Sequence, residues 1–231
     1  MKARIGIIGA MEPEICDLIS LLTDIQTETV SGIDFHFGFL KGKSVVIAKC
    51  GIGKVFAAMC TEIMILKYSP ELIVNTGVGG AVAEGLNTGD IVVADSLCQH
   101  DMDTSPIGDP VGLVSGINKI YFEADRLAVE LLVTLGERLG IHPKVGRIAT
   151  GDRFVAGVEE KSRIHNTFGA SACEMEGGAV AHVAYVNSTP FAVVRAISDS
   201  ADGEATEDYP TFLEKAAKKS AALTLALVES Y

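Results

Sequence analysis

Three short apolar runs constrain the fold of this chain more than any other feature of its sequence. Residues 4–10, 72–75 and 190–197 are almost continuously apolar, which is typical of strands buried in a parallel sheet. The longest apolar runs are about the length of a strand and far shorter than the roughly 20 residues that a membrane-spanning helix needs. With 231 residues, of which 48% are apolar, the chain can build one large core. We therefore predict an α/β fold with a single domain over residues 1–231; two small domains are the alternative.

Helix and turn patterns separate these runs. Apolar residues recur at helical spacing after Pro13, and a proline suits the first turn of a helix. Residues 27–50 have the pattern of two or three antiparallel strands, and we predict a glycine-rich turn at residues 76–80. The other predicted elements are helices at about 54–68, 125–140 and 209–229, strands at 90–95 and 144–150, and a polar loop at 99–108.

The charge and cysteine content exclude several classes of function. Aspartate and glutamate total 30 against 19 lysines and arginines, and the resulting net charge of −11 disfavours nucleic acid or an anionic membrane as a partner. The five cysteines are scattered and form no Cys-x-x-Cys pair, which argues against a disulfide framework and a zinc site. The N-terminus shows no signal-peptide pattern. We expect a cytoplasmic protein.

Three acidic side chains each follow a strand that is predicted to be buried. Glu14 lies in the first turn of the first helix, Glu176 lies where a strand turns into a helix, and Asp199 follows the apolar run 190–197. If the strands share one sheet, these carboxylates converge on one cleft. Glu174 and Glu176 would point to the same face of an extended segment, with Met175 opposite. The alternatives are a solvated acidic turn at 174–176 and, for Glu14, a role limited to the helix dipole.

The pattern predicts acid–base chemistry on a neutral or cationic substrate. Only Arg195 accompanies the carboxylates, so a phosphate-rich substrate is disfavoured. Two carboxylates in different environments can serve as acid and base, which suits cleavage of a bond to a sugar carbon. The residues by themselves therefore indicate an acid–base hydrolase or lyase.

Other motifs are less informative. The segment 51–54 contains glycines and a lysine but lacks the spacer of a phosphate-binding loop, and segment 76–80 is not a dinucleotide fingerprint. His100, Asp101 and Asp103 are a weak candidate for metal binding, and we predict no metal site. Phe154 follows a strand, where it could stack on a planar ring or belong to the core.

Six segments together resemble the 5′-methylthioadenosine/S-adenosylhomocysteine nucleosidases. They are residues 5–14, 50–55, 75–77, 89–93, 174–176 and 194–199, and they fall in order across nearly the whole chain. The resemblance implies a three-layer α/β/α fold of the nucleoside phosphorylase type with a mixed central sheet, usually assembled as a homodimer. It implies an adenine nucleoside as substrate, with no cofactor and no metal.

The resemblance also implies residue roles. Asp199 would be the general acid that protonates adenine N7, so it must hold a proton near neutral pH, and Glu14 would orient and deprotonate the attacking water. Glu176 would accept hydrogen bonds from the ribose hydroxyls, with Met175 packed on the sugar and Glu174 nearby. The remaining implied positions are Phe154 and Val155 at the purine, Met11, Ile52, Val78 and Tyr209 around the ribose and the 5′-thio group, and Thr104 and Ile107 in the pocket of the neighbouring subunit.

Two departures from the family pattern leave alternatives open. Val78 stands where many members have serine, and Thr104 and Ile107 replace residues that are often more apolar or aromatic. The preference at the 5′ side is therefore open, and an aminodeoxyfutalosine hydrolase is one alternative. A purine nucleoside phosphorylase of the same fold is another. A nucleoside-binding protein without catalysis is the alternative from a different class.

Overall fold

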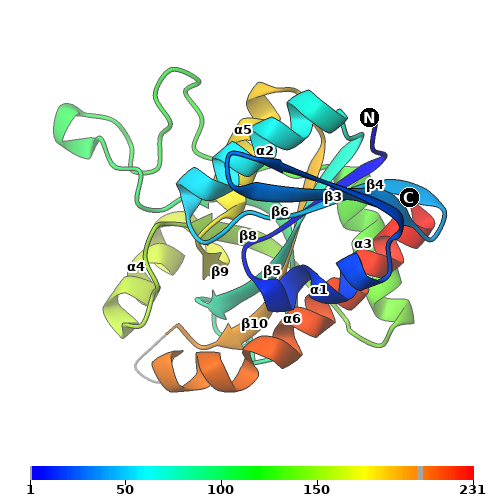
Figure 1. Cartoon of the computed structure of the whole chain (residues 1–231). Coiled ribbons are helices and arrows are strands. Elements are labelled where there is room, and N and C mark those ends of the chain that lie inside the picture. Colours follow the sequence, from blue (N-terminus) through cyan, green and yellow to red (C-terminus); the bar gives the residue numbers. More distant parts are fainter. Residues whose placement is uncertain (1, 202–204) are drawn as a thin grey trace.

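The computed structural model describes residues 2–201 and 205–231. Its strands and helices follow in this order: β1 (Ile5–Gly9), α1 (Glu12–Ser20), β2 (Thr23–Val30), β3 (Ile33–Leu40), β4 (Lys43–Lys49), α2 (Lys54–Tyr68), β5 (Leu72–Ala81), β6 (Ile91–Gln99), a 3₁₀ turn (Ser105–Ile107), β7 (Phe122–Glu123), α3 (Arg126–Arg138), β8 (Lys144–Thr150), α4 (Val158–Phe168), β9 (Ala170–Glu174), α5 (Gly177–Val186), β10 (Phe191–Asp199) and α6 (Ala205–Ser230) (Figure 1).

The three apolar runs form adjacent parallel strands, as predicted. β5 pairs in parallel with β1 on one side and with β10 on the other, and every residue of these strands is buried. β4 pairs in parallel with the other side of β1, and β3 and β2 follow as antiparallel strands at that edge of the sheet. β10 also pairs with β6 in the antiparallel sense, so the central sheet is mixed.

Five of the strands close into a ring. The pairings run from β10 to β6, from β6 to β8, from β8 to β9, from β9 to β5 and back from β5 to β10. The antiparallel contact of β9 with β5 places Cys173 opposite Gly80. Closure of the ring therefore brings the carboxyl end of β9 against the second half of β5, close to the end of β10.

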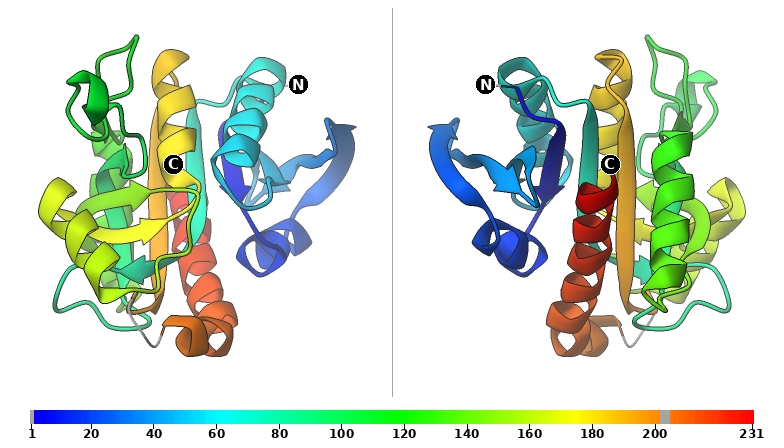
Figure 2. Two further views of the ribbon diagram at one scale, coloured as in Figure 1. Left: turned by 90° about the vertical axis from the view of Figure 1, so that its left-hand side faces the viewer. Right: turned by 90° about the vertical axis from the view of Figure 1, so that its right-hand side faces the viewer.

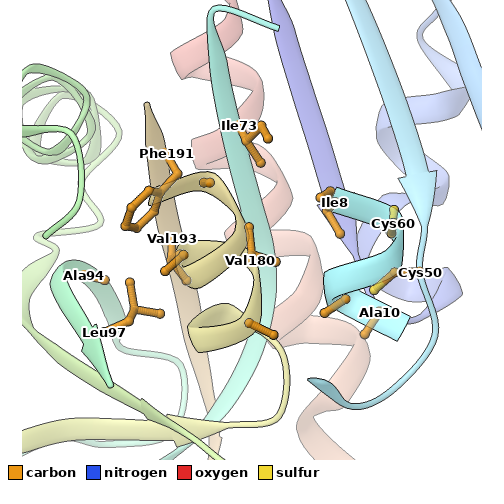
Figure 3. Close-up of a cluster of buried hydrophobic side chains, with 14 of the residues drawn as sticks. Ile8, Ala10, Cys50, Cys60, Ile73, Ala94, Leu97, Val180, Phe191 and Val193 are labelled. Atoms are coloured by element: carbon orange, nitrogen blue, oxygen red, sulfur yellow. The ribbon is translucent and has the colours of Figure 1, made fainter. Parts of the chain in front are cut away.

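Helices cover both faces of the sheet and give the three-layer α/β/α architecture (Figure 2). α2 and α5 contribute to one buried apolar cluster with the sheet, in which Val180 of α5 is grouped with Ile73 of β5 and Val193 of β10 (Figure 3). α1, α3 and α6 bury their apolar residues in a second cluster on the opposite face. Among the described residues, no helix combines the length and the apolarity that a bilayer crossing requires.

The prediction of a glycine-rich turn at residues 76–80 is wrong. β5 continues as a strand through Ala81, and Gly77, Gly79 and Gly80 do not have positive φ angles. These glycines serve close packing instead, because a Cβ at Gly79 would lie 2.8 Å from the carbonyl oxygen of Cys173.

Other boundaries also differ from the prediction. The last helix begins at Ala205 instead of near residue 209. Pro210 lies inside this helix, in its first two turns, and does not mark its start. Helix α4 was not predicted; its residues bury only Ile164 and Phe168, which leaves a weak apolar pattern.

Candidate active site

The carboxyl ends of β1, β9 and β10 and the second half of β5 surround a cavity of about 270 Å³. This volume lies near the lower end of the range for small-molecule sites, which begins at about 300 Å³. Every residue that the sequence analysis assigned to this subunit's own pocket lines it: Met11, Glu14, Ile52, Val78, Phe154, Val155, Glu174, Met175, Glu176, Asp199 and Tyr209. The structure thus brings together groups that are up to 198 positions apart in the chain, such as Met11 and Tyr209.

Glu14 is held in the first turn of α1 by backbone donors. Its Oε2 accepts hydrogen bonds from the N–H groups of Ala10 (2.7 Å) and Met11 (2.9 Å), and its Oε1 accepts one from Val78 (3.1 Å). Burial raises the pKa of this carboxyl group, while the charge of Arg195 and the three N–H donors oppose the rise. Glu12 differs, because it is exposed and pairs with Lys49 at 2.8 Å. Glu14 also caps α1 through the N–H of Met11, but its contact with Val78 and its place in the cavity wall go beyond a role limited to the helix dipole.

Asp199 is buried at the end of β10, with 2% of its surface exposed. The Ser198 hydroxyl donates a hydrogen bond to Oδ2 (2.8 Å), and the backbone N–H of Ala201 donates one to Oδ1 (2.9 Å). A hypothetical Cβ on Gly80 would lie 2.8 Å from Oδ1, so glycine at that position allows the carboxylate to approach β5. The aspartate is therefore fixed in orientation at the cavity wall.

Glu174 and Glu176 are both buried, which rules out a solvated acidic turn. Glu174 forms an ion pair with Arg195, whereas Glu176 accepts a hydrogen bond from the N–H of Gly53 (2.8 Å). Burial, together with the charge of Glu174, raises the pKa of Glu176 to about 8. The expectation that Met175 points to the opposite face is wrong, because β9 ends at Glu174 and the chain bends, so that Met175 lines the same cavity.

Each of the two arginines near the cavity pairs with an acidic side chain, although Glu160, the partner of Arg153, also pairs with Arg163 at 3.7 Å. Arg195, 1% exposed, pairs with Glu174, and Arg153 pairs with Glu160 at 3.2 Å. At the start of α2, Lys54 pairs with Asp101 at 2.6 Å, and its backbone N–H donates to Asp152. In segment 51–54 the N–H groups of Gly53 and Lys54 therefore donate to carboxylates, and the N–H of Gly51 donates to the carbonyl of Ala10.

Aromatic and apolar side chains form the outer part of the cavity. The rings of Phe154 and Tyr209 meet edge to face, with centroids 5.3 Å apart, and the Tyr209 hydroxyl lies 3.2 Å from the sulfur of Met11. Phe154 is 45% exposed and Ile52 is 54% exposed, so neither belongs to the core. The cavity thus has an acidic inner end and an apolar mouth, an arrangement that suits a planar base joined to a polar sugar.

Comparison with known proteins identifies the family. Residues 4–229 match the model of the phosphorylase superfamily. A 5′-methylthioadenosine/S-adenosylhomocysteine nucleosidase of Shewanella loihica is 39% identical over 231 residues, which cover 98% of this chain and 99% of the relative. This chain belongs to the 5′-methylthioadenosine/S-adenosylhomocysteine nucleosidase family.

Solved structures of the same fold support this membership. The Neisseria meningitidis nucleosidase, in complex with methylthio-immucillin-A, has a TM-score of 0.95 and 34% identity, and the match covers 98% of this chain and 99% of that one. A futalosine hydrolase of Helicobacter pylori also has a TM-score of 0.95, with 36% identity and coverage of 98% and 97%. The predicted nucleoside phosphorylase-type fold is therefore confirmed.

In this nucleosidase-family chain, Gly77 lets Glu14 pack against β5. A Cβ at position 77 would lie 2.5 Å from Oε1 of Glu14. We expect Gly77→Ala to displace the Glu14 carboxylate and to lower kcat for adenine release about tenfold, since packing strain of this kind costs about 1–3 kcal/mol. Gly157→Ala is the matched control, because a Cβ there meets no atom within 4 Å. An unchanged kcat in Gly77→Ala would show that the contact does not constrain Glu14.

Thr104 and Ile107 lie away from the cavity. They belong to the loop between β6 and β7, which projects from the body of the subunit in Figure 1. Ile107 is 82% exposed, and the Thr104 hydroxyl donates a hydrogen bond to Asp109 (2.8 Å). Their assignment to a neighbouring subunit's pocket stays a prediction.

Several residues that contact the site carboxylates were not predicted from the sequence. They include Ser198 on Asp199, Gly53 on Glu176 and Thr150 on Glu174. Thr150 carried a usable signal, since it is a polar residue at the carboxyl end of a predicted strand. His100, which was weighed as a metal ligand, is buried, and among the described residues its ring nitrogens have no hydrogen-bond partner. Over residues 2–201 and 205–231 there is no cluster of three His, Cys, Asp or Glu side chains arranged to hold a metal.

Proposed function

We propose that this protein hydrolyses the N-glycosidic bond of 5′-methylthioadenosine and S-adenosylhomocysteine, releasing adenine and the 5-thioribose product. The observation that carries the proposal is the placement of Glu14 and Asp199, both buried, in the wall of one cavity. Family membership supports the reaction class, and the apolar mouth at Phe154, Tyr209 and Met11 suits a purine and a thioether.

Asp199 acts as the general acid. It donates a proton to N7 of adenine, which makes the base a better leaving group as the bond to the ribose C1′ breaks. The contacts from Ser198 and Ala201 hold the carboxyl group in one orientation for that transfer. Phe154, at the mouth of the cavity, stacks on the purine, and the backbone at Val155 contacts its edge.

Glu14 acts as the general base. It removes a proton from the water that attacks C1′, so that one water is consumed and the sugar product gains the hydroxyl. A base must be ionised to accept this proton, and the three backbone N–H donors keep its oxygens fixed. Glu176 accepts hydrogen bonds from the ribose hydroxyls, which are donors suited to a carboxylate in an otherwise buried position.

Hydrolysis, and not phosphorolysis, is the reaction that the charges favour. A phosphate anion would be repelled by Glu14 and Glu176, and Val78 offers it no hydroxyl. Arg153, the cation among the described lining residues, already pairs with Glu160. We expect adenine release from 5′-methylthioadenosine to proceed at the same rate with and without phosphate, with a free sugar as product. Phosphate-dependent cleavage that yields a ribose 1-phosphate would overturn the proposal in favour of a phosphorylase.

A futalosine-type substrate is a second candidate, favoured by the structural similarity to the Helicobacter pylori futalosine hydrolase. Aminodeoxyfutalosine carries a larger, carboxylate-bearing 5′ group in place of a thioether. The 5′ side of the cavity is bordered by Met11 and Tyr209, neither of which supplies a cation. A comparison of kcat/KM on the two nucleosides separates the candidates, and we expect the thioether substrate to be preferred.

We also propose that the protein is a homodimer in the cytoplasm that needs no cofactor. Exposed apolar side chains gather on α2 and α5, namely Val55, Phe56, Leu66, Tyr185 and Val186, and the loop that bears Thr104 and Ile107 projects from the same subunit. Exposed apolar side chains concentrated on two neighbouring helices are consistent with a protein interface. All five cysteines are free, as in a reducing compartment. Light scattering of the purified protein would contradict the dimer if it gave the mass of one 24.3 kDa chain.

A further inference from the structure

The N-terminus of helix α5 borders the cavity, and its capping is unusual. Glu176 occupies the N-cap position but makes no side-chain capping hydrogen bond. An N-cap side chain ordinarily accepts a hydrogen bond from one of the first N–H groups of its own helix. Here the N–H groups are bonded elsewhere: Gly177 donates to Glu174 Oε2 (2.7 Å), and Gly178 donates to Thr150 Oγ1 (2.6 Å).

Two residues outside α5 therefore replace its cap. Glu174 Oε2 also accepts the N–H of Glu176 (3.1 Å), so one carboxylate binds two successive backbone donors. The Thr150 hydroxyl accepts a hydrogen bond from the N–H of Gly178 and donates one to Oε1 of Glu174. The hydroxyl group therefore uses both its proton and one of its lone pairs in this contact. Because these groups satisfy the helix terminus, the carboxylate of Glu176 is not needed there.

A buried network fixes this substitute cap in place. Arg195 forms an ion pair with Glu174 and also donates to the side chain and the carbonyl of Asn75. Asn75 in turn donates to the carbonyl of Ile8 (2.9 Å), which ties the network to β1. Thr150, Asn75 and Arg195 are at most 1% exposed. Removal of one partner from such a network leaves a buried polar group unpaired, which is costly.

The freed carboxylate of Glu176 points to other partners. It accepts the N–H of Gly53 (2.8 Å) from the start of α2 and lines the cavity. The lone pairs of Glu176 that Gly53 does not use can therefore accept hydrogen bonds from the hydroxyl groups of a ligand.

We propose that Thr150 and Glu174 are positioning residues, which cap helix α5 in place of Glu176 and thereby keep the Glu176 carboxylate free for the two ribose hydroxyls of the substrate. This inference rests on the proposed function, because it takes the ribose as the partner of Glu176. It assigns Glu174 to the support of the sugar site instead of to direct substrate contact. It also predicts that loss of the cap weakens specifically the contact between Glu176 and the sugar hydroxyls.

The test compares two substrates in one variant. Thr150→Val keeps the shape of the side chain and removes the hydroxyl. The measured quantity is kcat/KM for 5′-methylthioadenosine divided by kcat/KM for its 3′-deoxy analogue, which lacks one ribose hydroxyl. We expect this ratio to fall about tenfold in Thr150→Val, roughly the equivalent of one hydrogen bond. Thr150→Ser, which retains the hydroxyl, should restore the ratio of the wild-type protein.

Controls separate positioning from simple destabilisation. Thr61→Val removes another fully buried threonine hydroxyl, which bonds to the carbonyl of Ala57 within α2, and should leave the ratio unchanged. In a Glu176→Gln background, Thr150→Val should change the ratio no further, because the two residues act through one contact. Thermal unfolding checks each variant, and Thr150→Ala is measured in the same way if the valine variant does not fold.

An equal loss on both substrates, or no loss on either, would overturn the positioning role. Failure of the proposed function is distinguishable from this result, since it would appear in the wild-type protein as an absence of adenine release from 5′-methylthioadenosine.

Discussion

Replacement of Asp199 by asparagine should lower kcat for adenine release at least about 100-fold, the lower end of the contribution of a general acid. The amide has nearly the shape of the carboxyl group and can keep the contacts with Ser198 and Ala201, but it cannot transfer a proton to N7. Because the geometry is retained, we expect binding of the substrate to change less than kcat. A continuous assay for free adenine, with binding measured by calorimetry, gives both quantities.

The matched control is Asp17→Asn, a substitution of an exposed aspartate on α1 far from Asp199 in sequence. It should leave kcat unchanged. The same experiment separates the enzyme from the alternative of a nucleoside-binding protein, which predicts that Asp199→Asn has no effect on function. Full hydrolytic activity in Asp199→Asn would refute the assignment of the general acid.

Replacement of Glu14 by glutamine should have a comparable effect on kcat, about 100-fold or more, because glutamine cannot accept the proton of the attacking water. Glu12→Gln is the matched control on the same helix, since Glu12 is exposed and pairs with Lys49. The control should retain nearly full activity. Equal losses in the two variants would indicate a shared effect on α1 and would contradict a specific role of Glu14 as the base.

The pH dependence gives a second test of Glu14. Burial raises the pKa of Glu14 above 4.5, and a general base is active only when it is ionised. The value of kcat/KM should therefore fall as the pH is lowered through this raised pKa, at a higher pH than an ordinary glutamate would give. In Glu14→Gln the residual activity should lose this acidic limb, whereas Glu12→Gln should keep it. An acidic limb that persists unchanged in Glu14→Gln would assign the titration to another group.

Much of the candidate site could be predicted because its residues follow strands. Asp199 and the helix turn that bears Glu14 each follow an apolar run of strand length, and parallel strands bring their carboxyl ends to one edge of a sheet. The family resemblance then supplied roles that residue types and spacing could not. Phe154 was a candidate from its position after a strand, but its grouping with Tyr209 came only through the resemblance, since the two residues are 55 positions apart and meet only in the folded chain.

The errors have a common physical origin. Segment 76–80 was predicted as a turn because glycine is frequent in turns, yet here the glycines make room for a carbonyl and two carboxylates beside a continuous strand. Met175 was placed opposite its neighbours because strand alternation was extended past the end of β9. Local patterns describe the chain within a few residues, whereas these features depend on what packs against the chain.

The sequence by itself determined the strands, their burial, and the positions of Glu14 and Asp199 at strand ends, because hydrophobic periodicity is a local property. Only the tertiary structure decided how the four carboxylates differ. Glu174 pairs with Arg195, 21 positions away, and Glu14 accepts the N–H of Val78, 64 positions away. The N–H that binds Glu176 comes from Gly53, 123 positions away. Pairings over such distances leave no periodic trace in a chain, since they arise only when the strands and the helices that follow them assemble around the cavity.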